Sequence, residues 1–133
     1  MRQLVIHLVD DNDIDIAVNT KLLHLAEIGG EVLVYSSGTE FLTAIKSDQD
    51  RWKNQKNVVL LDIMMPGLTG FQCMDEFNQL DEALTNSFHV FMLSSSIDRS
   101  DIKRAEDTPR VHRVLEKPLD VYLLKKAIEQ IVL

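Results

Sequence analysis

The feature that most constrains the fold of this chain is a short apolar run that ends in a carboxylate. Residues 58–61 read VVLL, and Asp62 follows them directly. Continuous apolar character predicts a strand that is buried on both faces, as strands of parallel sheets are. Pro66, Gly67 and Gly70 come next and indicate a loop. Because a carboxylate at the end of a buried strand costs free energy unless a cation or donor meets it, we expect the rest of the chain to supply partners for Asp62.

Four further segments have the composition of buried strands, and helical patterns separate them. The predicted strands are residues 4–9, 32–35, 88–93 and 111–115, the last polar enough for an edge strand. The predicted helices are residues 14–28, a helix that carries Phe41, Leu42 and Ile45, residues 71–80 with a continuation to 84, residues 101–106 and residues 120–132. Strands that alternate with helices pair in parallel through right-handed crossovers. The pattern predicts an α/β fold, a doubly wound five-stranded parallel sheet with five helices on its two faces.

Composition and charge exclude several classes of protein. The 133 residues suit one domain that can bury a core without disulfides or metals. The net charge of -7 argues against nucleic acid or an anionic membrane as a direct partner, because both attract basic surfaces. The single Cys excludes an internal disulfide, and residues 1–3 lead straight into a strand, which leaves no room for a signal peptide. We therefore expect a cytoplasmic protein.

The helical segments also carry predictions about which side chains are buried. Apolar positions recur at Ile14, Ala17, Val18, Leu22, Leu25 and Ile28 in the first helix, and at Leu124, Ala127, Ile128 and Ile131 in the last. We expect both stripes to face the sheet, and Asp13 to cap the first helix. Residues 46–57 are mostly polar and indicate a loop or a frayed helix end. Trp52 in this segment either packs as an apolar anchor, which we favour, or contacts a partner.

Polar residues whose side chains can bind ions or react stand at the ends of four of the predicted strands. Asp10 and Asp11 follow the first strand, Asp62 the third, Ser94 the fourth and Lys117 the fifth. Because the carboxyl ends of parallel strands lie at one edge of a sheet, these side chains are expected to converge. Crowded carboxylates favour a hard divalent cation such as Mg²⁺, and a lysine with a hydroxyl can hold phosphate oxygens. The constellation predicts phosphoryl transfer with an Asp carboxylate as nucleophile.

The same residues resemble the receiver domain of two-component response regulators. The matching motifs are Asp10-Asp11, residues 61–66 (LDIMMP) with Gly70, Ser94, and Lys117-Pro118. Each motif is common by chance, but all of them in order at matching positions are specific. The resemblance covers residues 1–133 and implies a single receiver domain of the stand-alone type, like the chemotaxis response regulator. It also implies a flavodoxin-like sheet with strand order 2-1-3-4-5.

The resemblance implies a role for each carboxylate of the site. Asp62 corresponds to the phosphoacceptor, which attacks a phosphohistidine on a partner protein. Asp11, Asp62 and the backbone carbonyl of Met64 correspond to the Mg²⁺ ligands, and Asp10 corresponds to a residue that binds the ion through a water. The implied partners are a sensor histidine kinase or a histidine phosphotransfer protein, together with a downstream protein target. The chain is then a signalling domain and not an enzyme, and a monomer or weak homodimer.

The hydroxyl and the lysine also have counterparts in the family. Ser94 stands where the family has a Thr or Ser that reaches the phosphoryl group, and Lys117 corresponds to the phosphate-binding lysine. Pro118 is implied to follow a cis peptide bond. The chain departs from the family at Val114, where an aromatic switch residue is usual. Met64, two residues past the acceptor, is an apolar residue beside the path of a hydrolytic water, and we hypothesise that it slows dephosphorylation.

Two rival functions are compatible with the same motifs. The first is a Mg²⁺-dependent phosphohydrolase with Asp62 as nucleophile. Such enzymes typically place a second Asp two residues later as general acid, and Met64 occupies that position here. The second is a degenerate receiver that binds partners without being phosphorylated. The complete set of acids, hydroxyl and lysine argues against it.

Overall fold

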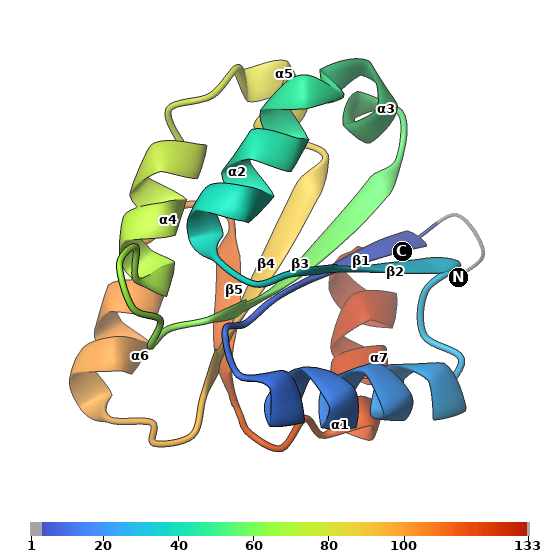
Figure 1. Ribbon diagram of the computed structural model, residues 1–133, viewed down its shortest axis with the longest axis vertical. Coiled ribbons are helices and arrows are strands. Elements are labelled where there is room, and N and C mark those ends of the chain that lie inside the picture. The colour runs from blue at the N-terminus through green and yellow to red at the C-terminus, as the bar shows by residue number, and fades with distance from the viewer. Residues whose placement is uncertain (1–3, 133) are drawn as a thin grey trace.

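A computed structural model describes residues 4–132 of the chain, so the predictions about residues 1–3 lie outside the described part (Figure 1). The five strands are β1 (Leu4–Val9), β2 (Glu31–Tyr35), β3 (Lys56–Asp62), β4 (Phe88–Ser94) and β5 (Val111–Glu116). The helices of this part are α1 (Asp13–Leu25), α2 (Gly38–Ser47), α3 (Gln49–Lys53), α4 (Gly70–Phe77), α5 (Glu82–Thr85), α6 (Arg99–Glu106) and α7 (Val121–Ile131). All strand pairs are parallel, in the order β2-β1-β3-β4-β5. The predicted fold class and strand order are confirmed.

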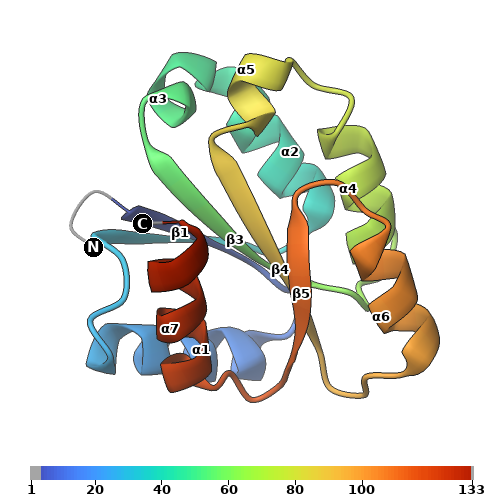
Figure 2. The ribbon, with the colours of Figure 1, turned by 180° about the vertical axis from the view of Figure 1, so that it is seen from behind.

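The helices cover the two faces of the sheet unequally. Figures 1 and 2 show α1 and α7 side by side on one face and the other helices on the opposite face. One apolar core lies under α2 to α6, and a smaller one lies under α1 and α7. None of the helices between residues 4 and 132 is both long and apolar enough to cross a membrane.

Strand β3 is the central strand and lies between β1 and β4. Its side chains alternate between the two cores, with Val59 and Leu61 in the larger and Val58 and Leu60 in the smaller. All four are fully buried. The prediction of a strand buried on both faces is therefore confirmed, and Asp62 stands at the carboxyl end of the central strand.

Two predicted boundaries were wrong. Residues 46–57 were expected to be a loop or a frayed helix end, but residues 49–53 form the separate helix α3 and residues 56–57 already belong to β3. Trp52 of α3 is 3% exposed and packs edge-on against the His7 ring at 4.8 Å, so it is the packed anchor that we favoured. The helix expected to extend to residue 84 is two helices, α4 and α5, because α4 ends at Phe77 with its cap at Asn78.

The predicted inner stripe of the first helix was wrong in part. Leu22 and Ile28 pack in the smaller core as expected, but Ile14 and Leu25 are 73% and 69% exposed. The helix is rotated so that Ile16, Leu23 and Ala26 also pack on the smaller core, with the buried Asn19 on the same side. Asn12, not Asp13, caps the helix by accepting from the Asp15 N–H. In α7 the stripe is correct except for Ile131, which is 40% exposed.

A buried polar network joins β1, β2 and β3 inside the larger core. The His7 ring lies 2.9 Å from the Tyr35 hydroxyl through Nδ1 and 3.0 Å from Asn57 Oδ1 through Nε2. Asn57 also donates to the Trp52 carbonyl at 2.8 Å. Because His7 is fully buried, its charged form is disfavoured, and its pKa falls to about 4. His7 is therefore a neutral residue of the protein interior at pH 7.

We expect this network to make the protein sensitive to acid. The unfolded chain binds a proton at His7 near pH 6.5, and the folded chain does so only near pH 4. The contribution of His7 to stability is therefore fully present above pH 6.5 and falls by about 3 kcal/mol as the pH drops to about 4. The difference between wild type and His7→Gln, measured by urea unfolding at pH 7 and at pH 4.5, gives this contribution. A matched change at the exposed His24, His24→Gln, should leave it unchanged.

Candidate functional site

The carboxyl edge of the sheet brings together the residues that end the apolar strands. Asp10 directly follows β1, Asp62 is the last residue of β3, Ser94 is the last residue of β4, and Lys117 directly follows β5. These positions are set by the parallel register of the strands, in which Val9 pairs with both Leu61 and Tyr35. The predicted convergence is therefore a consequence of strand order, because β1, β3, β4 and β5 are consecutive neighbours in the sheet.

Three carboxylates form the acidic cluster of the site. Oxygens of Asp10, Asp11 and Asp62 all lie within 4.8 Å of one another. Asp10 is fully buried and Asp62 is 5% exposed, whereas Asp11 faces solvent. Asp10 Oδ1 accepts from the Asn12 N–H at 3.0 Å, and Asp62 Oδ1 accepts from the Met64 N–H at 3.2 Å. A set of hard oxygen donors with one open side fits a divalent cation that keeps some of its waters.

Lys117 provides the positive charge of the site. Its ammonium lies 2.8 Å from Asp10, 3.0 Å from Asp15 and 3.2 Å from Asp62, and only 9% of its side chain is exposed. The ammonium therefore forms an ion pair with each of three carboxylates, and it donates a hydrogen bond to Asp15 Oδ2. Asp15 was missed at the sequence level because the wrong stripe of α1 was taken as the inner one. The signal was its place four residues before Asn19 and eight before Leu23, on the side of the helix that is buried.

The surroundings of the site raise the pKa values of both Lys117 and Asp62, which favours a charged lysine and disfavours ionisation of the aspartate. Burial, followed by the neighbouring charge of Asp10, raises the pKa of Asp62 to about 6, although Lys117 opposes the shift. Burial lowers the pKa of Lys117, but hydrogen bonds and charges from Asp10, Asp15 and Asp62 outweigh it, and the net pKa lies above the usual range. The crowded carboxylates therefore hold more negative charge than one lysine offsets, so a further cation at this site would be stabilising.

The Ser94 hydroxyl of the site forms its hydrogen bonds with the nearby backbone of Ser96. The Ser94 hydroxyl donates to the Ser96 carbonyl at 2.9 Å and accepts from the Ser96 N–H at 3.1 Å. Val114, in the position of the usual aromatic switch, is half-buried and packs against the larger core next to Met92. The Ser94 hydroxyl therefore has a local partner at Ser96, and no aromatic ring occupies position 114.

The loop after Asp62 is shaped by close backbone packing. A Cβ on Gly70 would lie 2.5 Å from the Asp62 carbonyl oxygen and 2.9 Å from the Ile63 Cα, so only glycine fits there. The Gly70 N–H donates to the Ile63 carbonyl at 2.9 Å, and Thr69 caps α4. Met64 is held on the outside of this loop with 73% of its surface exposed. The peptide bond between Lys117 and Pro118 is cis, as the resemblance implied.

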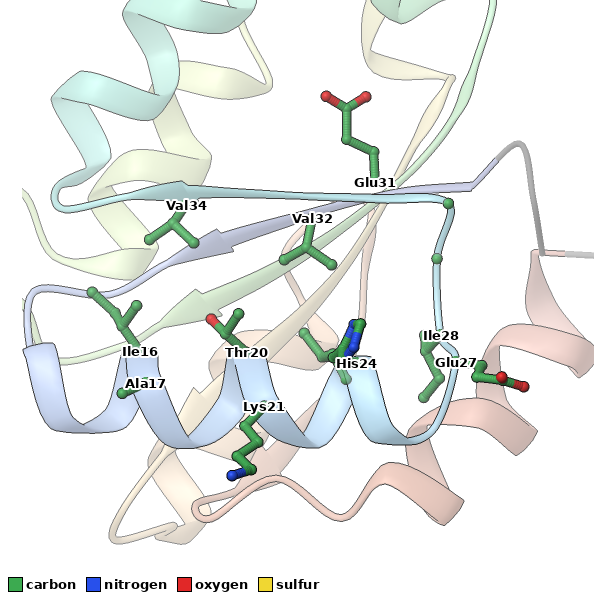
Figure 3. A pocket seen from close by; sticks show the side chains of 13 residues that line it. Ile16, Ala17, Thr20, Lys21, His24, Glu27, Ile28, Glu31, Val32 and Val34 are labelled. Atoms are coloured by element: carbon green, nitrogen blue, oxygen red, sulfur yellow. The ribbon is translucent and has the colours of Figure 1, made fainter.

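A separate hollow of about 1080 Å³ lies between α1 and β2 (Figure 3). Figure 3 shows Ile16 and Thr20 of α1 and Val32 and Val34 of β2 around this space. The lining contains none of the three clustered carboxylates, Ser94 or Lys117. The hollow is therefore not part of the acidic site.

The fold and the site together define a class of protein. A doubly wound parallel sheet with clustered carboxylates, a lysine and a hydroxyl at its carboxyl edge is an α/β domain built to receive an anionic group beside a carboxylate. The chain belongs to the response regulator receiver domain family, whose model matches residues 6–129. It is thus a receiver domain of two-component signalling, a family of phosphoacceptor domains that interact with histidine kinases or phosphotransfer proteins.

Solved structures agree with this assignment. A response regulator receiver protein from Dyadobacter fermentans is 30% identical, with a TM-score of 0.84 and 96% of each chain covered. A two-component response regulator from Cytophaga hutchinsonii is 26% identical, with a TM-score of 0.89 and 99% and 98% covered. The chemotaxis protein CheY4 of Vibrio cholerae is 20% identical, with a TM-score of 0.74 and 97% and 98% covered, and supports the fold alone.

Proposed function

We propose that Asp62 accepts a phosphoryl group from a phosphohistidine in a Mg²⁺-dependent reaction. Residues 1–133 then act as a single receiver domain in the cytoplasm, as a monomer or weak homodimer, and signal by protein contact without binding nucleic acid or membrane. The observation that carries the proposal is the meeting of Asp62 with the other two clustered carboxylates and with the Lys117 ammonium at 3.2 Å. Under this proposal, one sheet edge supplies the nucleophile, the cation ligands and the positive charge that binds phosphate.

The proposed reaction assigns a task to each side chain. A carboxylate oxygen of Asp62 attacks phosphorus, the bond from phosphorus to the imidazole nitrogen breaks, and the departing imidazole takes up a proton. Lys117 binds a phosphoryl oxygen, and the Ser94 hydroxyl leaves Ser96 to bind another. Mg²⁺ would be held by Asp11, Asp62 and the Met64 carbonyl, with Asp10 acting through a water. The ion supplies charge that lowers repulsion between the acceptor and the phosphoryl oxygens.

Incubation with acetyl phosphate and Mg²⁺ tests the proposal against the phosphohydrolase alternative. A receiver forms one stable aspartyl phosphate, seen as a single mass increase that maps to Asp62. A phosphohydrolase instead releases many equivalents of phosphate from small esters. Failure to modify Asp62 at all would favour the degenerate receiver. A pull-down that compares wild type, Asp62→Asn and beryllofluoride-treated protein would then identify the partners and their dependence on phosphorylation.

The exposed stripe of α1 favours this helix as the docking face for the phosphodonor protein. Ile14, Val18 and Leu25 are 73%, 43% and 69% exposed and lie on one side of the helix, whose first turn adjoins Asp10 and Asp11. We expect Ile14→Ser to slow phosphoryl transfer from the cognate donor about tenfold, since an apolar anchor is lost. The rate with acetyl phosphate should stay unchanged. Equal slowing with both donors would contradict a docking role.

Met64 is expected to set the lifetime of the phosphoryl group. Its thioether is exposed beside the acceptor and offers no group that orients an attacking water. We expect Met64→Asn to shorten the lifetime about tenfold, because a positioned amide can hold that water. The decay of phosphorylated protein after removal of acetyl phosphate measures the effect. Met64→Leu is the control, and it should decay at the wild-type rate.

A further inference from the structure

Asp15 is a fourth carboxylate at the edge of the site, contributed by the first turn of α1. Its Oδ2 lies 3.0 Å from Lys117 Nζ, a contact between residues that are 102 positions apart in the chain. The Asp15 backbone is fixed by the N-cap, since its N–H donates to Asn12 Oδ1 at 3.0 Å. The carboxylate is thus aimed at the lysine from a rigid helix end.

Asp15 differs from the other two partners of Lys117 in having no share in the cation cluster. Asp10 and Asp62 belong to the group of three carboxylates, and Asp15 does not. A divalent cation bound by this cluster would be attracted to the carboxylates of Asp10 and Asp62, and it would repel the Lys117 ammonium. When Asp62 becomes an acyl phosphate, its own carboxylate charge is lost as well. Asp15 is therefore the partner that belongs to Lys117 alone.

We propose that Asp15 is a positioning residue that keeps the Lys117 ammonium beside Asp62 while the other two carboxylates are shared with the cation and the phosphoryl group. The ammonium donates a hydrogen bond to Asp15 and pairs with the charge of Asp10, which leaves it able to donate to the phosphoryl oxygens that form at Asp62. This inference rests on the proposed phosphoacceptor function.

A second contact from the same helix face supports the assignment. One turn beyond Asp15, the buried Asn19 accepts a long hydrogen bond from the Leu119 N–H at 3.4 Å. Helix α1 thus touches the chain on both sides of Pro118, and the loop that carries Lys117 is bound to α1 at two points. This explains why polar residues occupy the inner face of a helix that covers an apolar sheet.

The first experiment compares Asp15→Asn with Asp13→Asn, a matched change of charge at an exposed position in the same helical turn. With acetyl phosphate and saturating Mg²⁺, we expect Asp15→Asn to phosphorylate about tenfold more slowly, as loss of one charge-assisted hydrogen bond implies. Asp13→Asn should stay within about twofold of wild type. Asp15→Glu should recover part of the rate. If Asp15→Asn is as fast as wild type or faster, Asp15 only repels the incoming phosphoryl group and the inference is wrong.

A second readout needs neither metal nor phosphorylation. Acylation of lysines, followed site by site by mass spectrometry, should label Lys117 severalfold faster in Asp15→Asn, because a lost carboxylate partner frees the amine. Labelling of the exposed Lys21 serves as the internal reference, and Asp13→Asn should label like wild type. Unchanged labelling of Lys117 in Asp15→Asn overturns the inference. If wild type cannot be phosphorylated but labelling changes as expected, the proposed function fails and the positioning contact stands.

Discussion

Replacement of Asp62 by Asn is expected to abolish phosphorylation. The amide oxygen is a far weaker nucleophile than the carboxylate, and the cation cluster loses one of its three members. We expect incorporation from acetyl phosphate or from a protein donor to fall by at least about 10³-fold, which is below detection in most assays. Mass spectrometry of the intact protein measures it. Residual modification that maps to another residue, such as Asp11, would show that the acceptor was assigned wrongly.

The same variant should be more stable than wild type when metal is absent. The pKa of Asp62 is raised to about 6 in the folded state, above its ordinary value of 3.8, so the folded chain holds a proton that the unfolded chain releases. The contribution of Asp62 to stability therefore falls as the pH rises through this window, and at pH 7 the ionised acceptor costs on the order of 2 kcal/mol. Asn removes that cost, and Lys117 retains Asp10 and Asp15 as partners.

Chemical unfolding with and without Mg²⁺ separates this effect from a change in the fold. At pH 7 without metal, Asp62→Asn should unfold at a higher urea concentration than wild type. Added Mg²⁺ should stabilise wild type and have little effect on the variant, because ligand binding to the folded state adds to its stability. If the variant is less stable than wild type at pH 7 without metal, ionised Asp62 does not destabilise the folded protein.

Replacement of Lys117 by Met is expected to have the opposite effect on stability. The fully buried Asp10 and the nearly buried Asp62 would lose the cation that lies 2.8 Å and 3.2 Å away. Removal of one partner from a buried ion pair leaves uncompensated charge, and we expect a loss of about 3 kcal/mol at pH 7. Phosphorylation should also slow strongly, because the phosphoryl oxygens lose their positive partner.

Mg²⁺ should offset more of the damage in Lys117→Met than it adds to wild type. The ion then becomes the sole positive charge among the clustered carboxylates. The exposed Lys126→Met is the control, and its stability should stay within about 0.5 kcal/mol of wild type. Urea unfolding of the three proteins with and without Mg²⁺ gives the comparison. If the two variants behave alike, Lys117 is only a surface lysine.

The sheet and most of the site follow from local sequence signals. Residues 58–61 are apolar without interruption, and only a central strand of a parallel sheet buries both of its faces. The alternation of strands and helices forces parallel pairing, and parallel pairing brings the strand ends to one edge. Asp10, Asp62, Ser94 and Lys117 could be placed together for this reason, although they are distant in the chain.

Only the tertiary structure decided the orientation of α1 and, with it, the surroundings of Lys117. The helix has two stripes of suitable spacing, one through Ile14 and Val18 and one through Asn19 and Leu23. The second is buried, because Leu23 and its apolar neighbours pack on the smaller core while Asp15 and Asn19 contact the Lys117 loop. Those contacts join positions 100 or more residues apart, so periodicity within the helix does not contain them. The amino-acid pattern determined that the Asp62 carboxylate would need a positive partner at this edge of the sheet. The packing of α1 determined that Asp15 is a further carboxylate that contacts that partner, the Lys117 ammonium.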